Sequence, residues 1–272
     1  MANKVHRRER PKDLKKQRWA AIVAAILAFG MLASVVGGYL GLTYGGGAGL
    51  GQEQADPQPE DYLAYYEGEV ERLEEYLDQH DPSPPVLVEL AENYRYLSFI
   101  QQMYFNDQEA VEEYQGRVLS IYETLTDLEP DNPRFRLELI NIYQEQQKDE
   151  SMISEEIAIT QQLLRDNPDP VAHLSLIAFL DADGREDLKQ EEVDWLYGHL
   201  GSRVAGGEAD NEENLYYAFL LGEYMDEPAA AKPLLEEILT EESEDSWLYR
   251  EAENYLSYLE TEDDLEEDTY LD

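Results

Sequence analysis

Residues 121–133, IYETLTDLEPDNP, contain the end of one helix, a turn and the start of the next helix. Tyr122, Leu125 and Leu128 follow one another at intervals of three residues, so a helix places them on one face. The proline that follows ends this helix, because proline has no amide hydrogen to donate. A second helix follows Asn132 and Pro133, and Asn106 and Asp107 offer a cap at the start of the first. We therefore expect the chain to be built from α-hairpins.

Apolar residues recur at helical spacing from Asp61 to Leu259, and no alternating run is long enough for a β-strand. Clusters of proline, glycine and small polar residues interrupt this pattern, at residues 81–85, 166–170, 201–207 and 240–243. The pattern predicts about ten helices. Their apolar stripes cover residues 63–77, 87–97, 110–128, 135–143, 153–164, 174–178, 188–200, 215–225, 229–239 and 247–259.

The helix breaks recur at a nearly constant interval. Pro130 and Pro168 lie 38 residues apart, Gly201 follows 33 residues later, and the break at residues 240–243 lies about 40 residues beyond it. A period in the thirties indicates a helical solenoid, in which each hairpin buries its apolar face against its neighbours. The predicted fold class is all-α, an α-hairpin solenoid over residues 61–259 that follows a single N-terminal transmembrane helix.

Residues 121–133 resemble the second helix and closing turn of a tetratricopeptide repeat, through Tyr122, Leu125, Leu128 and the acidic-Pro-x-Asn-Pro turn at residues 129–133. The resemblance extends over residues 85–259 and implies a curved inner face that binds a peptide or protein. The stretch between Tyr94 and Val118 is about 15 residues longer than the family's spacing, which implies either an extended first helix or an inserted loop. A related two-helix repeat is the alternative. The residues that resemble other positions of the repeat are Leu90, Ala91 and Tyr94, then Leu139, Ile140 and Tyr143, and finally Ala231, Leu235 and Ile238.

The repeat register implies which side chains face the groove. Glu92, Arg95, Asn141 and Gln144 fall on the inner side of predicted first helices, and we take them as candidate protein-binding residues. Some members of the family hold a carboxylate tail with a cluster of basic residues on this face. The inner positions here do not supply that cluster, so the predicted ligand is not a carboxylate tail.

No charged side chain occurs between Arg18 and Glu53. Residues 19–44 form the apolar part of this uncharged stretch. A helix of that length would span roughly 39 Å, more than the thickness of the hydrocarbon core of a bilayer, about 30 Å. These residues are the predicted transmembrane helix, and a cleaved signal peptide is the alternative. Residues 45–60, rich in glycine and proline, are the predicted flexible tether. Within the span, Ala33, Gly37, Gly41 and Gly45 form a small-residue face that would allow a homodimer.

The chain has a net charge of −41, and this charge is distributed unequally along the sequence. Residues 1–18 carry eight Lys and Arg against two acidic residues, and such a basic flank is retained in the cytoplasm. We therefore expect a single-pass protein of the cytoplasmic membrane, with its N-terminus inside and its acidic body outside. The body would repel nucleic acid and favour a basic partner. Adaptation to salt or alkali is an alternative explanation of the acidity.

Sequence motifs for catalysis are missing. The chain has no cysteine, its four histidines are scattered, and it contains neither HExxH nor GxSxG. We therefore predict no enzyme, no cofactor and no metal site. Residues 181–184, DADG, are better explained as a turn between helices than as a calcium loop, because the ligand positions around this glycine are chemically wrong. The acidic residues 260–272 are a predicted disordered tail.

These features together predict a membrane-anchored, extracytoplasmic scaffold that binds other proteins. A chaperone or assembly factor for exported or membrane proteins is the alternative function, because a tethered body could meet newly exported chains. A calcium- or salt-responsive structural protein is a third hypothesis for the function.

Overall fold

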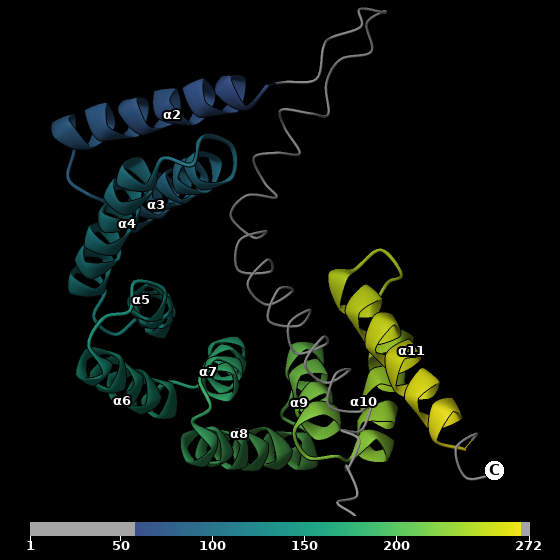
Figure 1. Ribbon diagram of the computed structural model, residues 1–272. Coiled ribbons are helices and arrows are strands. Elements are labelled where there is room, and N and C mark those ends of the chain that lie inside the picture. The colour runs from purple at the N-terminus through teal and green to yellow at the C-terminus, as the bar shows by residue number, and fades with distance from the viewer. Residues whose placement is uncertain (1–57, 268–272) are drawn as a thin grey trace, which may run out of the picture. The chain divides into compact units, whose positions relative to one another are not determined.

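The computed structural model describes residues 58–267, and the side chains as far as residue 261. In this part of the chain all regular structure is helical (Figure 1), so the all-α prediction with about ten helices is confirmed there. The elements are α2 (Pro59–Gln79), α3 (Pro84–Ile100), the π-helix η1 (Gln101–Phe105), α4 (Gln108–Leu128), α5 (Pro133–Glu145), α6 (Glu150–Asp166), α7 (Pro170–Ala182), α8 (Glu186–Gly206), α9 (Asn211–Glu223), α10 (Pro228–Glu241) and α11 (Trp247–Glu267).

The described helices form two compact units, which we call the N-terminal unit (residues 58–167) and the C-terminal unit (residues 168–267). In the N-terminal unit α2 packs on α3, α3 on α4, α4 on α5 and α5 on α6. In the C-terminal unit α7 packs on α8, α8 on α9, α9 on α10 and α10 on α11, and α9 also contacts α7 and α11. Packing between successive helices is typical of α-hairpin arrays, so each unit is consistent with the predicted solenoid.

Side-chain caps start several of the helices. The carboxylate of Asp107 accepts a hydrogen bond from the amide of Ala110 and begins α4. Asn132, Asp169 and Asp210 cap α5, α7 and α9 in the same way, and each of these three helices is 13 residues long. Each cap satisfies an amide that would otherwise lack a partner at the helix start.

The extra length between Tyr94 and Val118 is an extended first helix. α3 continues into η1, which ends at Asn106 with a left-handed φ of 52°. The first helices of the hairpins consequently begin at Pro84, Pro133, Pro170 and Asn211, which are 49, 37 and 41 residues apart. The repeat is therefore longer and less regular than the predicted period in the thirties.

Three predicted boundaries differ from the structure. The predicted tether, residues 45–60, overlaps α2, because Gln58 and Asp61 form a capping box and proline is accepted at the first helical position. Gly201 does not break a helix: α8 continues to Gly206, and Gly207 follows with a φ of 66°. α11 runs to Glu267, so the predicted disordered tail, residues 260–272, begins as helix.

The membrane prediction falls outside the described residues. This holds for the basic tail 1–18, for the span 19–44 with its small-residue face at Ala33, Gly37, Gly41 and Gly45, and for the tether up to residue 57. Within residues 58–267, no helix is both long and apolar enough to cross a bilayer.

The core of each unit lies between successive helices. In the N-terminal unit the side chains of Leu73, Leu97, Leu125, Ile140 and Ile157 are almost completely buried. In the C-terminal unit one apolar cluster joins α7, α8 and α9, and a second joins α9, α10 and α11. Full burial of such a side chain stabilises the fold by roughly 1.5–3 kcal/mol. α9 contributes to both clusters and so connects the hairpins of its unit.

Candidate protein-binding surfaces

The four candidate residues all lie in the N-terminal unit, two on α3 and two on α5. Asn141 and Gln144 are exposed on α5, whereas Glu92 and Arg95 are half-buried on α3. An ion pair connects the two helices, because Nη2 of Arg95 donates to Oε2 of Glu138 at 2.8 Å. The structure therefore brings α3 and α5 together, as the repeat register requires.

Arg95 is held by contacts within the fold. Its guanidinium also lies over the ring of Tyr122, 5.3 Å from the centroid, so one side chain touches α3, α4 and α5. Burial and the nearby carboxylate of Glu138 both raise the pKa of Tyr122, and this keeps its hydroxyl protonated. Because the charge of Arg95 is already paired with Glu138, we assign Arg95 a role in positioning the helices.

Glu92 gives this face a partly buried negative charge. Burial raises the pKa of its carboxyl group, and the carboxylates of Glu89 and Glu138 raise it further, while Arg95 lowers it. A cation that approached this face would relieve the repulsion among these carboxylates. The arrangement therefore favours a basic partner over an acidic one.

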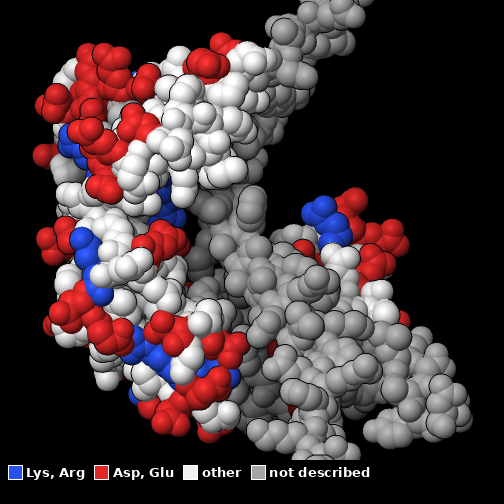
Figure 2. All heavy atoms as spheres, viewed as in Figure 1, with Lys and Arg blue, Asp and Glu red and all other residues white. Residues whose placement is uncertain are grey.

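A larger surface was missed by the sequence analysis. We call it the aromatic surface: it comprises exposed apolar side chains on the first turns of α2, the last turns of α3, and η1. Figure 2 shows an uncharged area over this part of the N-terminal unit, beside regions rich in carboxylates. Its members are Tyr62, Tyr65, Tyr96, Phe99, Met103, Tyr104 and Phe105, with 38–62% of each residue exposed.

Ring contacts make the aromatic surface continuous between helices. The ring of Tyr66 stacks on that of Tyr96, with 4.7 Å between centroids, and also meets Tyr65 edge to face at 5.1 Å. Phe99 and Met103 follow Tyr96 at intervals of three and four residues, so they share its side of the helix. The surface therefore runs from α2 across α3 toward η1.

The signal for this surface was present in the sequence. The apolar stripe of α2 consists of Leu63, Tyr66, Val70, Leu73 and Leu77, and Tyr62 and Tyr65 fall outside it. An aromatic residue outside the buried stripe of an amphipathic helix indicates an exposed contact surface.

Two groups of titratable side chains in the C-terminal unit make contacts within the fold. His173 and Glu192 are completely buried, and Nδ1 of the histidine lies 3.3 Å from Oε2 of the glutamate. The turn at residues 181–184 is confirmed as a connection between helices. Its carboxylates face basic side chains: Nζ of Lys189 donates to Oδ1 of Asp181 at 2.7 Å, and Arg185 pairs with Asp183.

Comparison of the chain with protein-family models, with curated proteins and with solved structures finds no match. The likeness to tetratricopeptide repeats therefore stays a prediction from the sequence. The features of the described residues that bear on function are the aromatic surface and the face of α3 and α5 that carries Glu92.

Proposed function

We propose that the protein is a membrane-anchored scaffold that binds other proteins outside the cytoplasmic membrane. The uncharged residues 19–44 and the basic residues before them support the anchor and its orientation. A solenoid of the tetratricopeptide-repeat kind over the described helices would present its surfaces at the end of a short tether.

The aromatic surface carries this proposal. The chain has a net charge of −41, and its carboxylates favour contact with water. A continuous exposed area of tyrosine, phenylalanine and methionine is unusual on such a chain and indicates a surface that another molecule covers. These residue types are enriched at protein interfaces because they bury a large area with little loss of side-chain freedom. The occupant we propose is a protein segment with apolar anchor residues flanked by basic ones, which matches the surrounding charge.

The inner face adds a polar contribution in the same unit. Glu92, Asn141 and Gln144 can bind a peptide through hydrogen bonds and charge, while Arg95 holds α3 against α5. Truncating these polar residues would change specificity more than total affinity, because apolar anchors dominate binding energy.

A chaperone or assembly factor for exported or membrane proteins is the second candidate. Met103 in η1 favours it, because the flexible methionine side chain adapts to many partners. Membranes solubilised in detergent distinguish the two functions. A scaffold would copurify with one partner in fixed ratio, whereas a chaperone would copurify with many exported proteins.

The decisive variant is F99S/Y104S in the full-length protein. Removing two exposed rings should lower recovery of the partner by about tenfold, the effect of losing roughly 1.4 kcal/mol of interface energy. The matched control is Trp247→Ser, because this exposed ring lies in the C-terminal unit. Equal recovery from F99S/Y104S and wild type would contradict the proposal. Reporters fused at residues 5 and 272 should face opposite sides of the membrane.

A further inference from the structure

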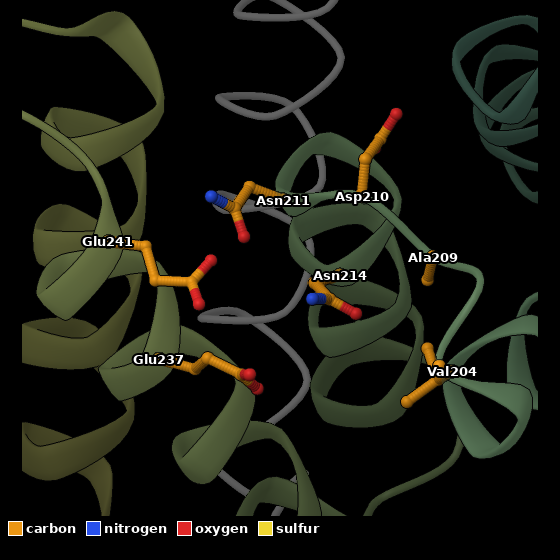
Figure 3. A pocket seen from close by; sticks show the side chains of 8 residues that line it. Val204, Ala209, Asp210, Asn211, Asn214, Glu237 and Glu241 are labelled. Carbon is orange, nitrogen blue, oxygen red and sulfur yellow. The ribbon is translucent and has the colours of Figure 1, made fainter.

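A pocket of about 400 Å³ lies in the C-terminal unit, between the end of α8, the start of α9 and the last turns of α10. Figure 3 shows Glu237 and Glu241 of α10 directed toward Asn211 and Asn214 of α9. Val204 lines the pocket from the end of α8. One wall is closed by a hydrogen bond, in which Nδ2 of Asn211 donates to Oε1 of Glu242 at 2.9 Å.

The pocket has a negative charge that its own residues do not neutralise. Glu237 and Glu241 are exposed, lie one helical turn apart on the same face, and take part in no ion pair among the described residues. Asp210, also in the lining, is already in use because it accepts the amide of Glu213 at 2.9 Å. The nearby Arg203 donates to the carboxylate of Glu213 at 2.7 Å, outside the pocket lining.

A second feature of the pocket is the buried side chain of Asn214. Only 8% of this residue is exposed, its side chain lines the pocket, and no hydrogen bond joins that side chain to another described residue. Asn93 of α3 is equally buried, yet its Nδ2 donates to the carbonyl oxygen of Glu89 at 2.7 Å. Buried amides are normally hydrogen-bonded, so the partner of the Asn214 amide, water or ligand, lies in the pocket that this side chain lines.

We propose that this pocket binds an organic cation, a primary ammonium or guanidinium group carried on a flexible apolar chain. Glu237 and Glu241 would pair with its charge, and Oδ1 of Asn214 would accept one of its N–H groups. Val204 and Ala209 would contact its methylene groups, as apolar surfaces do along lysine and arginine stems.

The chemistry disfavours a metal ion as occupant. Calcium requires six to eight oxygen ligands, and magnesium requires close to octahedral geometry. In residues 58–261, no three His, Asp or Glu side chains are placed to hold a metal ion. The volume of the pocket suits one long side chain. The carboxylates of Glu237 and Glu241, together with the amide of Asn214, suit a group with several N–H donors.

Two sources could supply this cation: a lysine or arginine side chain of a partner protein, or a free polyamine. The inference does not depend on the proposed scaffold function, because the pocket lies in the other unit from the aromatic surface. The F99S/Y104S variant should bind the cation as the wild type does, so failure of one proposal leaves the other standing.

The experiment observes Asn214 directly. Full-length protein in detergent, labelled with ¹⁵N in its asparagine side chains, is titrated with acetyl-Gly-Gly-Lys-Gly-Gly-amide and, separately, with spermidine. The Asn214 signal is identified by its loss in Asn214→Ala. We expect a saturable shift of this signal, and no shift with the peptide whose lysine is acetylated, because acetylation removes the charge.

Charge-matched variants separate the pocket from the general acidic field. E237Q/E241Q should weaken binding by about tenfold or more, because it removes both paired charges. E71Q/E75Q removes the same charge from an exposed turn of α2 and should change binding by less than about twofold, because α2 contributes no residue to the lining of the pocket. Glu237→Gln alone provides a milder second variant.

Tighter binding of the peptide would identify a partner's side chain as the source, and tighter binding of spermidine would identify a free polyamine; both support the pocket. Two results would overturn the proposal. One is the absence of a saturable shift at Asn214 with either probe. The other is equal weakening by E71Q/E75Q and E237Q/E241Q.

Discussion

The N-terminal and C-terminal units are built alike from helical hairpins, but they treat their large side chains differently. Among the described residues, every large hydrophobic side chain that is exposed belongs to the N-terminal unit except Trp247. The C-terminal unit instead buries His173 and Glu192, stacks Trp195 on both His173 and His199, and exposes an acidic pocket. The buried residues of each unit stabilise its fold, whereas the exposed aromatic side chains and carboxylates are available for contacts with other molecules.

The largest expected effect concerns two side-chain contacts that join helices, one in each unit: His173 with Glu192, and Arg95 with Glu138. Glu192→Ala should lower the free energy of unfolding by about 2–5 kcal/mol, because it removes completely buried atoms and leaves a cavity beside His173. Glu138→Ala should lower it by less than about 1 kcal/mol, because the Arg95–Glu138 pair is partly exposed and solvent screens it. Urea unfolding of the full-length protein, followed by circular dichroism, measures both.

Equal losses from the two substitutions would show that burial does not distinguish these pairs. Glu192→Gln serves as a control, because it keeps the volume of the side chain and removes only the carboxylate. Its free energy of unfolding should lie between that of Glu192→Ala and that of the wild type.

Glycines in the two units should respond in opposite directions to alanine. A Cβ at Gly222 of α9 would meet the hydroxyl of Tyr255 and lie 3.4 Å from Leu259, so Gly222→Ala should cost about 1–3 kcal/mol. Gly68 of α2 has nothing within 4 Å of that position, so Gly68→Ala should stabilise by about 0.5–1 kcal/mol through helix propensity. Thermal unfolding compares the two, and a stabilising Gly222→Ala would contradict the packing of α9 on α11.

The smallest effect is a difference in pH dependence. Burial, Arg203 and His173 lower the pKa of His199, with Glu213 opposing them, so the folded C-terminal unit disfavours the charged imidazole. Its stability should fall as pH drops below about 6.5, the ordinary pKa of histidine, and His199→Gln should reduce that loss.

Glu92 of the N-terminal unit should behave in the opposite sense. Because burial raises the pKa of Glu92, its charge destabilises the folded state at neutral pH. Glu92→Gln should therefore stabilise at pH 7, and the advantage should disappear as pH falls toward about 4.3, where the free side chain is itself protonated. Melting temperatures from pH 4 to pH 8 test both residues, and an advantage of Glu92→Gln that grew at low pH would contradict this account.

Most of the fold could be predicted because the information is local. Apolar spacing and the caps at Asp107, Asn132 and Asp169 depend on neighbouring residues, and the helices begin close to these positions. Gly201 misled the prediction because its place inside α8 depends on a distant contact: the Tyr217 hydroxyl would lie 2.8 Å from a Cβ there. The missing side chain of Gly201 allows the close approach of Tyr217, so this glycine does not mark a helix end.

The binding surfaces were harder to predict because they depend on what remains after packing. The repeat register could place Glu92, Arg95, Asn141 and Gln144 on first helices, but the ion pair of Arg95 with Glu138 could be found only from the structure. The two pocket carboxylates could not be distinguished among 61 acidic residues. Only the contacts show which acids are already paired.

The central claim is that the aromatic surface of the N-terminal unit contacts a protein partner. A photo-crosslinking amino acid placed at Tyr104, and separately at Trp247, tests it in membranes that contain the full-length chain. The account predicts a discrete crosslinked product from position 104 that disappears when Phe99→Ser is added, and no such product from position 247. The same products from both positions, or a product from position 104 that survives Phe99→Ser, would contradict it.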